Sequence, residues 1–282
     1  MSFRTIWRKG LSAMMMSLTG LCALITVSAL IVILGYLAWN GATALHWTFF
    51  TNLPAPVGET GGGIANAIVG SAKLLLLAAL MGVPVGLLGA IYLAEYASPI
   101  PAFLVRYSAD MLNGVPSIVM GIFAYTLVVI PMQHFSAYAG GFALGVMMIP
   151  IILRSCEDFL RAVPGSLREG AMGVGASKWK TITSVVVPAA SGGIMTAILL
   201  ALSRVAGEAA PLLFTAFGNR FWSSGFNEPI ASLPLVIYTY AISPYEDWHR
   251  QAWAAGLVLL ALVLVTNIVA RTLLSRPAGQ RR

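Results

Sequence analysis

Long uncharged apolar runs, separated by short polar segments, dominate the pattern of this chain. Residues 10–58 contain no Asp, Glu, Lys or Arg, and within them residues 18–39 are long and apolar enough to cross a membrane as a helix. A second such run covers residues 74–94. A third, residues 111–153, is long enough for two helices, with the turn residues of 131–141 between them. The pattern therefore predicts four membrane helices before residue 154.

Two further apolar segments complete the predicted set of spans. Residues 192–213 predict a fifth helix, which contains Arg204 and Glu208, and residues 251–270 predict a sixth. The first span is too long for a signal-peptide core and has no small-residue cleavage site directly after it, so we expect it to be retained. The sequence thus predicts an all-α polytopic membrane protein with six transmembrane helices.

Local signals add detail to three of these segments. Pro116 predicts that the third helix begins or bends there. The small residues Gly82, Gly86 and Gly89 predict a closely packed face on the second helix. The external segment 215–250, which carries prolines and several aromatic residues, is expected to contain short interfacial helices.

The distribution of Lys and Arg predicts the orientation of the chain. Six spans place both termini on one side, and the segments on that side carry thirteen basic residues, whereas the other side carries two, Arg220 and Arg250. Because basic residues are concentrated in cytoplasmic loops, both termini are predicted to be cytoplasmic. The thirteen are Arg4, Arg8, Lys9, Arg106, Arg154, Arg161, Arg168, Lys178, Lys180, Arg271, Arg276, Arg281 and Arg282.

Composition excludes several classes of function. The chain has 58% hydrophobic and 10% charged residues, whereas soluble domains carry about 25% charged residues. Its net charge of +7 follows from the topology and needs no nucleic-acid partner. The two cysteines, Cys22 and Cys156, are not expected to form a disulfide. The sequence has no phosphate-binding loop for ATP, no metal-binding pattern among its three histidines, and no candidate catalytic residue.

The polar segment between the fourth and fifth spans predicts a helix, a glycine turn and a second short helix. Small residues at Gly170, Ala171, Gly173 and Gly175 would let another surface approach the backbone closely. The second helix is predicted to end at Pro188, because proline interrupts the hydrogen-bond ladder of a helix.

This segment resembles the EAA loop of ABC importer permeases. The pattern of that loop is Glu-Ala-Ala, three residues, Gly, nine residues, Ile, one residue and Leu-Pro; Glu169, Ala171, Gly175 and Pro188 match it, while residues 170, 185 and 187 are Gly, Val and Val. In this family the loop is the coupling helix that docks into the ATP-binding subunit. The resemblance therefore implies that Glu169, Ala171, Gly175 and Pro188 belong to an ATPase-coupling site. The alternative is an ordinary amphipathic cytoplasmic loop.

Three more stretches are similar to the phosphate-specific branch of that family, and to its A-type subunit in particular. They are Ile-Tyr-Leu-Ala-Glu-Tyr at 91–96, Asn-Gly-Val-Pro-Ser-Ile-Val-Met-Gly at 113–121, and the Arg-Val-Ala-Gly-Glu-Ala-Ala-Pro-Leu-Leu-Phe-Thr-Ala run at 204–216. The resemblance implies the type I ABC importer permease (MetI-like) fold. The expected division is a cytoplasmic N-terminus (1–17), a first helix with its external loop (18–62), a permease domain (63–270, with the coupling loop at 154–190) and a cytoplasmic C-terminus (271–282).

Arg204 and Glu208 are the candidate residues of the substrate pathway. If the fifth helix starts near Gly192, Arg204 lies about 18 Å along it, near the middle of a hydrocarbon core of about 30 Å. A charge at that depth costs at least about 2.5–3.5 kcal/mol unless it is paired or faces water. Glu208, four residues on, is within pairing reach. A guanidinium can bind phosphate oxygens, so the pair is either a pathway site or a structural ion pair, or both.

Lys73 and Arg220 are possible entrance charges. Lys73 lies at the outer end of the second span, where the simpler expectation is that it reaches to the membrane interface. The simpler expectation for Arg220 is a solvated loop charge. Each is also a candidate for attracting an anion to the outer mouth.

The resemblance implies a permease subunit of an ATP-driven importer of inorganic phosphate, without a cofactor of its own. The implied partners are a second related permease, two ATP-binding subunits and an external phosphate-binding protein, in the cytoplasmic membrane of a prokaryote. One alternative is a permease for another oxyanion such as sulfate, molybdate or phosphonate. Another is a channel or an ion-gradient-driven secondary transporter, which would require internal repeats and intramembrane acids.

Overall fold

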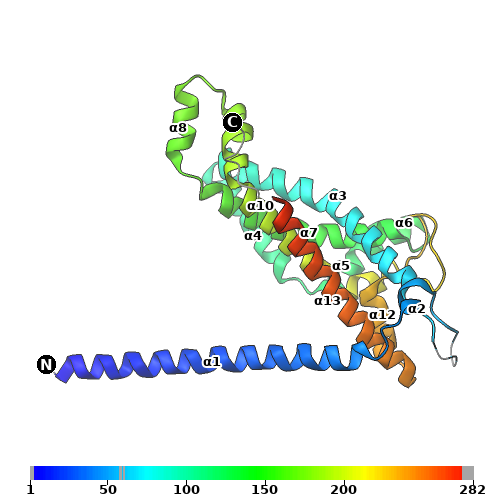
Figure 1. Cartoon of the computed structure of the whole chain (residues 1–282). Coiled ribbons are helices and arrows are strands. Elements are labelled where there is room, and N and C mark those ends of the chain that lie inside the picture. The colour runs from blue at the N-terminus through cyan, green and yellow to red at the C-terminus, as the bar shows by residue number, and fades with distance from the viewer. Residues whose placement is uncertain (1–2, 57–58, 60, 275–282) are drawn as a thin grey trace.

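Helices make up most of the chain, as the apolar pattern predicts. The computed structural model describes residues 3–56, 59 and 61–274. Within them, β structure is limited to two isolated bridges, Pro54–Gly62 and Phe217–Ile230. Five long helices form the framework (Figure 1): α1 (Phe3–Ala42), α3 (Ala65–Glu95), α7 (Ala137–Arg161), α10 (Val187–Ala206) and α13 (Glu246–Leu274). The shorter elements are α2 (Trp47–Thr51), α4 (Pro99–Gly114), α5 (Ser117–Ala124), η1 (Tyr125–Val129), α6 (Ile130–Met132), α8 (Gly165–Gly173), α9 (Lys178–Thr181), η2 (Ile182–Val186), α11 (Ala210–Leu213) and α12 (Leu233–Ala241).

The number of potential membrane spans is five, or six when one bent pair counts as a single span. Five helical stretches of the described chain are long and apolar enough to cross a bilayer. The sixth is the pair Pro99–Gly114 and Ser117–Met132, whose axes meet at 103°. The break falls at Val115 and Pro116, where the predicted bend is confirmed. The predicted third span therefore exists only as this sharply bent pair.

Two prolines are accommodated within helices by π-helical turns. Pro188 was predicted to end a helix, and this prediction is wrong, because α9, η2 and α10 form one helix over Lys178–Ala206. In an α-helix the proline ring would collide with the carbonyl four residues earlier, and the wider π-helical turn of η2 directly before α10 relieves that conflict. The same arrangement occurs at Pro131, which follows η1.

The bounds of two predicted spans also need correction. The fourth span does not end at Leu153 but continues to Arg161 as α7, so Arg154 and Arg161 lie on a helix. The fifth does not cover residues 192–213, because the helix starts at Lys178 and ends at Ala206. In the segment 215–250, α12 is a short helix, as expected there.

The packing of α3 against α7 forms the centre of the bundle. A Cβ atom on Gly82 would lie 2.9 Å from Met148 Cβ, and one on Gly86 would lie 2.8 Å from Ile152 Cβ. Such distances are too short for any larger residue, so the predicted close-packing face of α3 is confirmed. Met148 and Ile152 belong to the main apolar core, together with residues of α5 and α10.

Helix α1 extends away from the bundle and contacts it near its C-terminal end (Figure 1). There the Tyr36 ring packs edge-on against Trp253 of α13, with centroids 5.2 Å apart. Most of the apolar side chains along the rest of α1 are exposed, which suits a lipid environment. The predicted cytoplasmic C-terminus is described only to residue 274, so Arg276, Arg281 and Arg282 lie outside the described residues.

Candidate functional site

The segment between α7 and α10 forms the predicted helix, turn and helix. Helix α8 covers Gly165–Gly173, and the chain then reverses at Gly175, whose φ of +89° is the left-handed conformation that favours glycine. Two backbone bonds close this turn, from Gly175 N to Met172 O (3.0 Å) and from Ala176 N to Ala171 O (3.1 Å). The Ser177 side chain then caps α9 by accepting a bond from Lys180 N.

This hairpin projects from one end of the molecule, opposite the end that carries α2 and α12 (Figure 1). None of the residues of α8 is buried. Four large apolar side chains of the hairpin are exposed: Leu167 (46%), Met172 (47%), Val174 (87%) and Trp179 (59%). Apolar side chains exposed together on a protruding element are typical of a surface that binds another protein.

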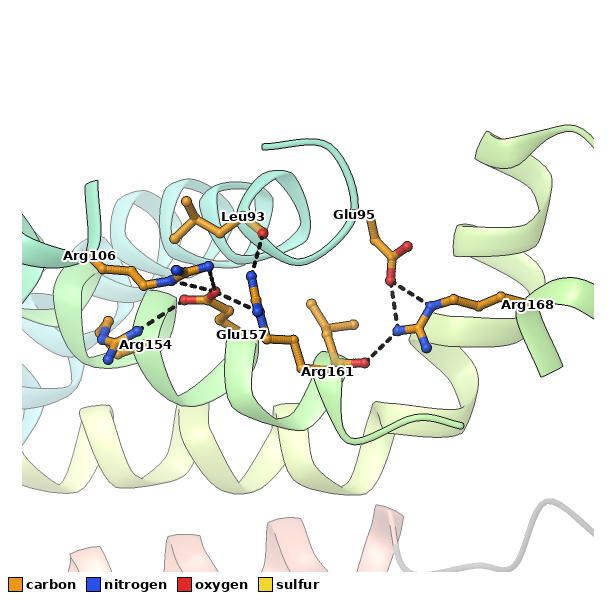
Figure 2. A network of polar contacts seen from close by, with 8 residues as sticks. Leu93, Glu95, Arg106, Arg154, Glu157, Arg161 and Arg168 are labelled. Atoms are coloured by element: carbon orange, nitrogen blue, oxygen red, sulfur yellow. Dashed lines mark hydrogen bonds and ion pairs between the residues drawn. The ribbon is translucent and has the colours of Figure 1, made fainter. Parts of the chain in front are cut away.

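The hairpin is fixed to the bundle by the end of α3. Arg168 of α8 donates through Nη2 and Nε to Glu95 Oε1, over 2.8 and 3.0 Å (Figure 2). The same guanidinium donates to the carbonyl oxygens of Leu160 and Val163. On the other flank, the Lys178 ammonium lies 4.4 Å from the centroid of the Tyr96 ring. Both flanks of the hairpin are therefore held at the end of α3, by Glu95 and by Tyr96 directly after it.

A second group of charges surrounds Glu157 on α7, one turn before the hairpin begins. Its carboxylate, 1% exposed, accepts hydrogen bonds from Arg106 Nε of α4 (2.8 Å) and from Arg154 Nη1 (3.1 Å), and it forms an ion pair with Arg161 (2.8 Å) (Figure 2). Arg154 also donates to Asp110 of α4 (2.9 Å). A buried charge requires such compensation, and here one carboxylate joins α4 to α7.

The two groups meet at the last turns of α3. Arg161 donates to the Leu93 carbonyl (3.2 Å), two residues before Glu95, the partner of Arg168 (Figure 2). Helices α3, α4, α7 and α8 are thus joined by one continuous set of ion pairs and charge-assisted hydrogen bonds. Such bonds are stronger than neutral ones.

The predicted coupling residues do not all lie together. Glu169 and Gly175 are exposed and Ala171 is half-buried, and all three belong to α8 or to the turn after it. Pro188 lies instead within the continuous helix of α10, beyond η2. The structure therefore brings together three of the four, and it separates Pro188 from the turn.

The predicted pairing of Arg204 with Glu208 is wrong. Arg204 occupies the last turn of α10, and the helix ends at Ala206 with Gly207 as its cap, so Glu208 is not one helical turn further along the same face. No ion pair joins the two within the part of the chain that the structure describes. Because the helix starts at Lys178 rather than Gly192, Arg204 is near its far end and not at its middle. Its side chain is exposed.

The two candidate entrance charges have different surroundings. The Lys73 ammonium donates to the carbonyl oxygen of Ser223 (2.8 Å) and lies 5.4 Å from the centroid of the Phe226 ring, so it joins the loop after α11 to α3. Arg220 is exposed, and its guanidinium lies 5.0 Å from the centroid of the Trp248 ring. No group of three metal-ligating side chains occurs among residues 3–56, 59 and 61–274.

Sequence reasoning missed the roles of Glu95, Glu157 and Arg168. In the sequence pattern, Arg154, Arg161 and Arg168 indicate only the cytoplasmic side of the membrane. The spacing of Arg154, Glu157 and Arg161, three and four residues apart, would have indicated neighbours on one helical face, had the helix been extended past Leu153. No local signal connects Arg168 with Glu95, which is 73 residues away.

Comparison with known proteins identifies the family. Residues 82–278 match the family model described as binding-protein-dependent transport system inner membrane component. The chain belongs to this family. Among curated relatives, this permease is 42% identical over 271 residues to the phosphate transport system permease protein PstA of Yersinia pestis, covering 96% of this chain and 92% of that protein. It is 47% identical over 239 residues to the protein of the same name from Xylella fastidiosa, covering 84% and 83%.

Solved structures share the fold of this permease at low sequence identity. One is a bacterial alginate ABC transporter in complex with an alginate pentasaccharide-bound periplasmic protein, with a TM-score of 0.66 and 15% identity over 97% of this chain and 96% of that one. Another is the MetNI methionine ABC transporter, with a TM-score of 0.57 and 18% identity over 75% and 92%. The expected type I ABC importer permease fold is thereby confirmed, and the chain is an inner membrane component.

Proposed function

We propose that this chain is the permease subunit of an ATP-driven importer that carries inorganic phosphate across the inner membrane. The relatives named as phosphate transport system permeases support this cargo, because the identity of 42% to the Yersinia pestis protein extends over 96% of the chain. The observation that carries the mechanism is the exposed hairpin at α8, which is fixed to three bundle helices through Arg168 and its neighbours.

In this proposal a separate ATP-binding subunit binds the hairpin on the cytoplasmic side. Glu169, Ala171 and Gly175 lie at the centre of the contact, and the exposed side chains of Met172 and Val174 supply apolar area around them. The permease itself is non-catalytic and has no cofactor. The complete importer contains two ATP-binding subunits, a second related permease and an external phosphate-binding protein, and both termini of this chain are cytoplasmic.

The geometry suggests how nucleotide-driven movement reaches the bundle. A displacement of α8 acts on Glu95 through Arg168, on the last turn of α7 through the Leu160 carbonyl, and on the segment directly after α7 through the Val163 carbonyl. Glu157 ties α7 to α4, whose end meets the bent break at Pro116. Movement of the hairpin would therefore shift α3, α4 and α7 together, which is what alternating access requires.

Arg204 remains the candidate for contact with the anion along the path. Its guanidinium is exposed and has no carboxylate partner among the described residues, so its donors are available to phosphate oxygens. Glu208, which follows the end of α10, moderates the positive charge of this region without pairing to it.

Uptake by the reconstituted complex tests the proposal. Proteoliposomes with the complete importer should accumulate radiolabelled phosphate when ATP is supplied, and excess sulfate or molybdate should not compete. Competition by either anion at similar concentration would assign the permease to another oxyanion. Uptake driven by a proton gradient in the absence of ATP would contradict the coupling mechanism.

A further inference from the structure

A cavity with both polar and apolar lining residues lies at the end of the molecule opposite the hairpin. It has a volume of about 280 Å³ and is formed by the beginnings of α3 and α13, by α12 and by the loop after α11. Its apolar walls include Leu213, Phe217 and Leu235, and no carboxylate is among its lining residues. The polar lining residues are Asn66, Asn219, Arg220, Ser232, Thr239 and Tyr240. A cavity with one cation and no acid favours an anionic ligand.

Arg220 is held in place without its hydrogen-bond donors being consumed. Its guanidinium lies over the Trp248 ring, and Trp248 in turn stacks on Tyr240 with centroids 4.5 Å apart and planes 22° apart. Within the described chain, Arg220 makes no side-chain hydrogen bond and no ion pair. Stacking thus restricts the side chain and leaves the planar fork of N–H groups free to bind an oxyanion.

Tyr240 provides a neutral donor beside this cation. Burial raises the pKa of its phenol, and the nearby Arg220 guanidinium opposes that shift only in part. The hydroxyl is therefore protonated at neutral pH, so it adds a hydrogen-bond donor and no negative charge to the cavity.

Two buried polar atoms on lining residues have no partner among the described residues. One is the hydroxyl oxygen of Ser232, and the other is the side-chain carbonyl oxygen of Asn66. The amide orientation of Asn66 is fixed, because its Nδ2 donates to the Asn219 carbonyl (2.7 Å). Buried polar atoms without a protein partner need an explanation, and a bound ion is one. A partly protonated phosphate offers both acceptor oxygens and a donor hydroxyl.

We propose that this cavity is an outer binding site for free inorganic phosphate, with Arg220 as its principal ligand. This inference deepens the proposed function and rests on it, because the site would receive the same cargo before it reaches Arg204, which does not line the cavity. The cavity is built from loops and helix ends that lie outside the five candidate spans, except for the first turns of α3 and α13. This position favours a dissolved anion over a lipid headgroup as the ligand.

Equilibrium dialysis of radiolabelled phosphate against the assembled importer, in a phosphate-free maltoside detergent and without binding protein, tests the site. Arg220→Gln should weaken binding by about tenfold or more, since it removes a charge-assisted contact. Arg250→Gln is the matched control: Arg250 is exposed on α13 and does not line this cavity. It should leave binding unchanged. Ser232→Ala should weaken binding by a smaller factor.

Several outcomes would overturn the inference. They are unchanged binding in Arg220→Gln, an equal loss in Arg250→Gln, and displacement of phosphate by phosphatidylglycerol at low molar excess, which would assign the cavity to a lipid headgroup. Phosphate uptake by the wild-type importer separates this inference from the proposed function. If uptake is normal but Arg220→Gln binds as wild type, only the outer site is wrong. If the wild type takes up no phosphate, the proposed function itself is wrong.

Discussion

The Arg168 guanidinium lies 2.8 Å from the Glu95 carboxylate and thereby joins the exposed hairpin to the end of α3. Both side chains are mostly shielded from solvent, with 20% and 8% of their surface exposed. Arg168 also donates two hydrogen bonds to the carbonyl oxygens of Leu160 and Val163. Solvent therefore weakens this ion pair less than it weakens an exposed surface pair, and the attachment is firm.

Removal of this attachment should uncouple transport from ATP hydrolysis. Arg168→Ala eliminates charge-assisted bonds that each contribute about 1.5–3 kcal/mol, so we expect phosphate uptake to fall about tenfold or more while ATPase activity persists. Lys180→Ala, which removes an exposed charge on α9, should retain uptake. Parallel measurement of uptake and ATP hydrolysis in proteoliposomes decides the matter. Normal uptake in Arg168→Ala would contradict the role of this pair.

Loss of the Glu157 charge should destabilise the bundle. In Glu157→Gln, Arg106 and Arg161 lose their carboxylate partner while Arg154 keeps Asp110. Because these arginine side chains are 27–49% exposed, the cost should be below the penalty of about 3–5 kcal/mol for breaking a fully buried ion pair. The midpoint of thermal unfolding in detergent should therefore drop clearly. Asp158→Asn removes the adjacent, exposed carboxylate and should change stability by no more than about 0.5 kcal/mol. Similar midpoints for the two variants would refute the prediction.

A side chain at Gly175 should impair docking through the backbone alone. No heavy atom lies within 4 Å of an added Cβ, but the φ of +89° makes any L-residue strained, at about 1–2 kcal/mol for alanine. Gly175→Ala should thus distort the turn and reduce the amount of ATP-binding subunit that co-purifies. Gly165→Ala is the matched control, since Gly165 begins α8 without a positive φ and also has open space around it. Equal recovery of the subunit from both variants would count against the docking role of the turn.

Replacement of Arg204 should stop transport without affecting assembly. Its side chain is exposed and unpaired among the described residues, so Arg204→Ala removes no protein contact that stabilises the fold. We expect uptake to be abolished and co-purification of the ATP-binding subunit to be normal. Arg271→Ala, which removes an exposed charge from the last turn of α13, should transport normally. Normal uptake in the Arg204 variant would exclude it from the pathway.

Local features of the chain were predictable because they depend on nearby residues. The long apolar runs predict the helices, since burial in lipid requires about 20 apolar residues in a row. Pro116 predicts the 103° bend, and Gly175 predicts the turn after α8. The small residues of α3 predict its close contact with α7, because only glycine allows the backbones to approach at Gly82 and Gly86.

Other features depend on residues that are distant in the sequence. Pro188 does not end its helix, because the π-helical turn at 182–186 accommodates the proline ring. The proline alone does not indicate whether such a turn forms before it. The same helix ends at Ala206, so Glu208 lies outside it and is separated from Arg204. The partners of the arginines were equally hidden, since Arg168 and Glu95 are 73 residues apart, and Arg106 and Glu157 are 51.

The amino-acid sequence alone determined the membrane class, the helices and the turn that presents α8, because hydrophobic length and glycine conformation act within one segment. The tertiary structure decided which charges meet. It turned four arginines that the sequence marks only as cytoplasmic into a network around Glu95, Asp110 and Glu157, and it left Arg204 and Arg220 without acidic partners among the described residues. The physical reason is that ion pairing depends on distances of a few ångströms between helices, which only their packing sets.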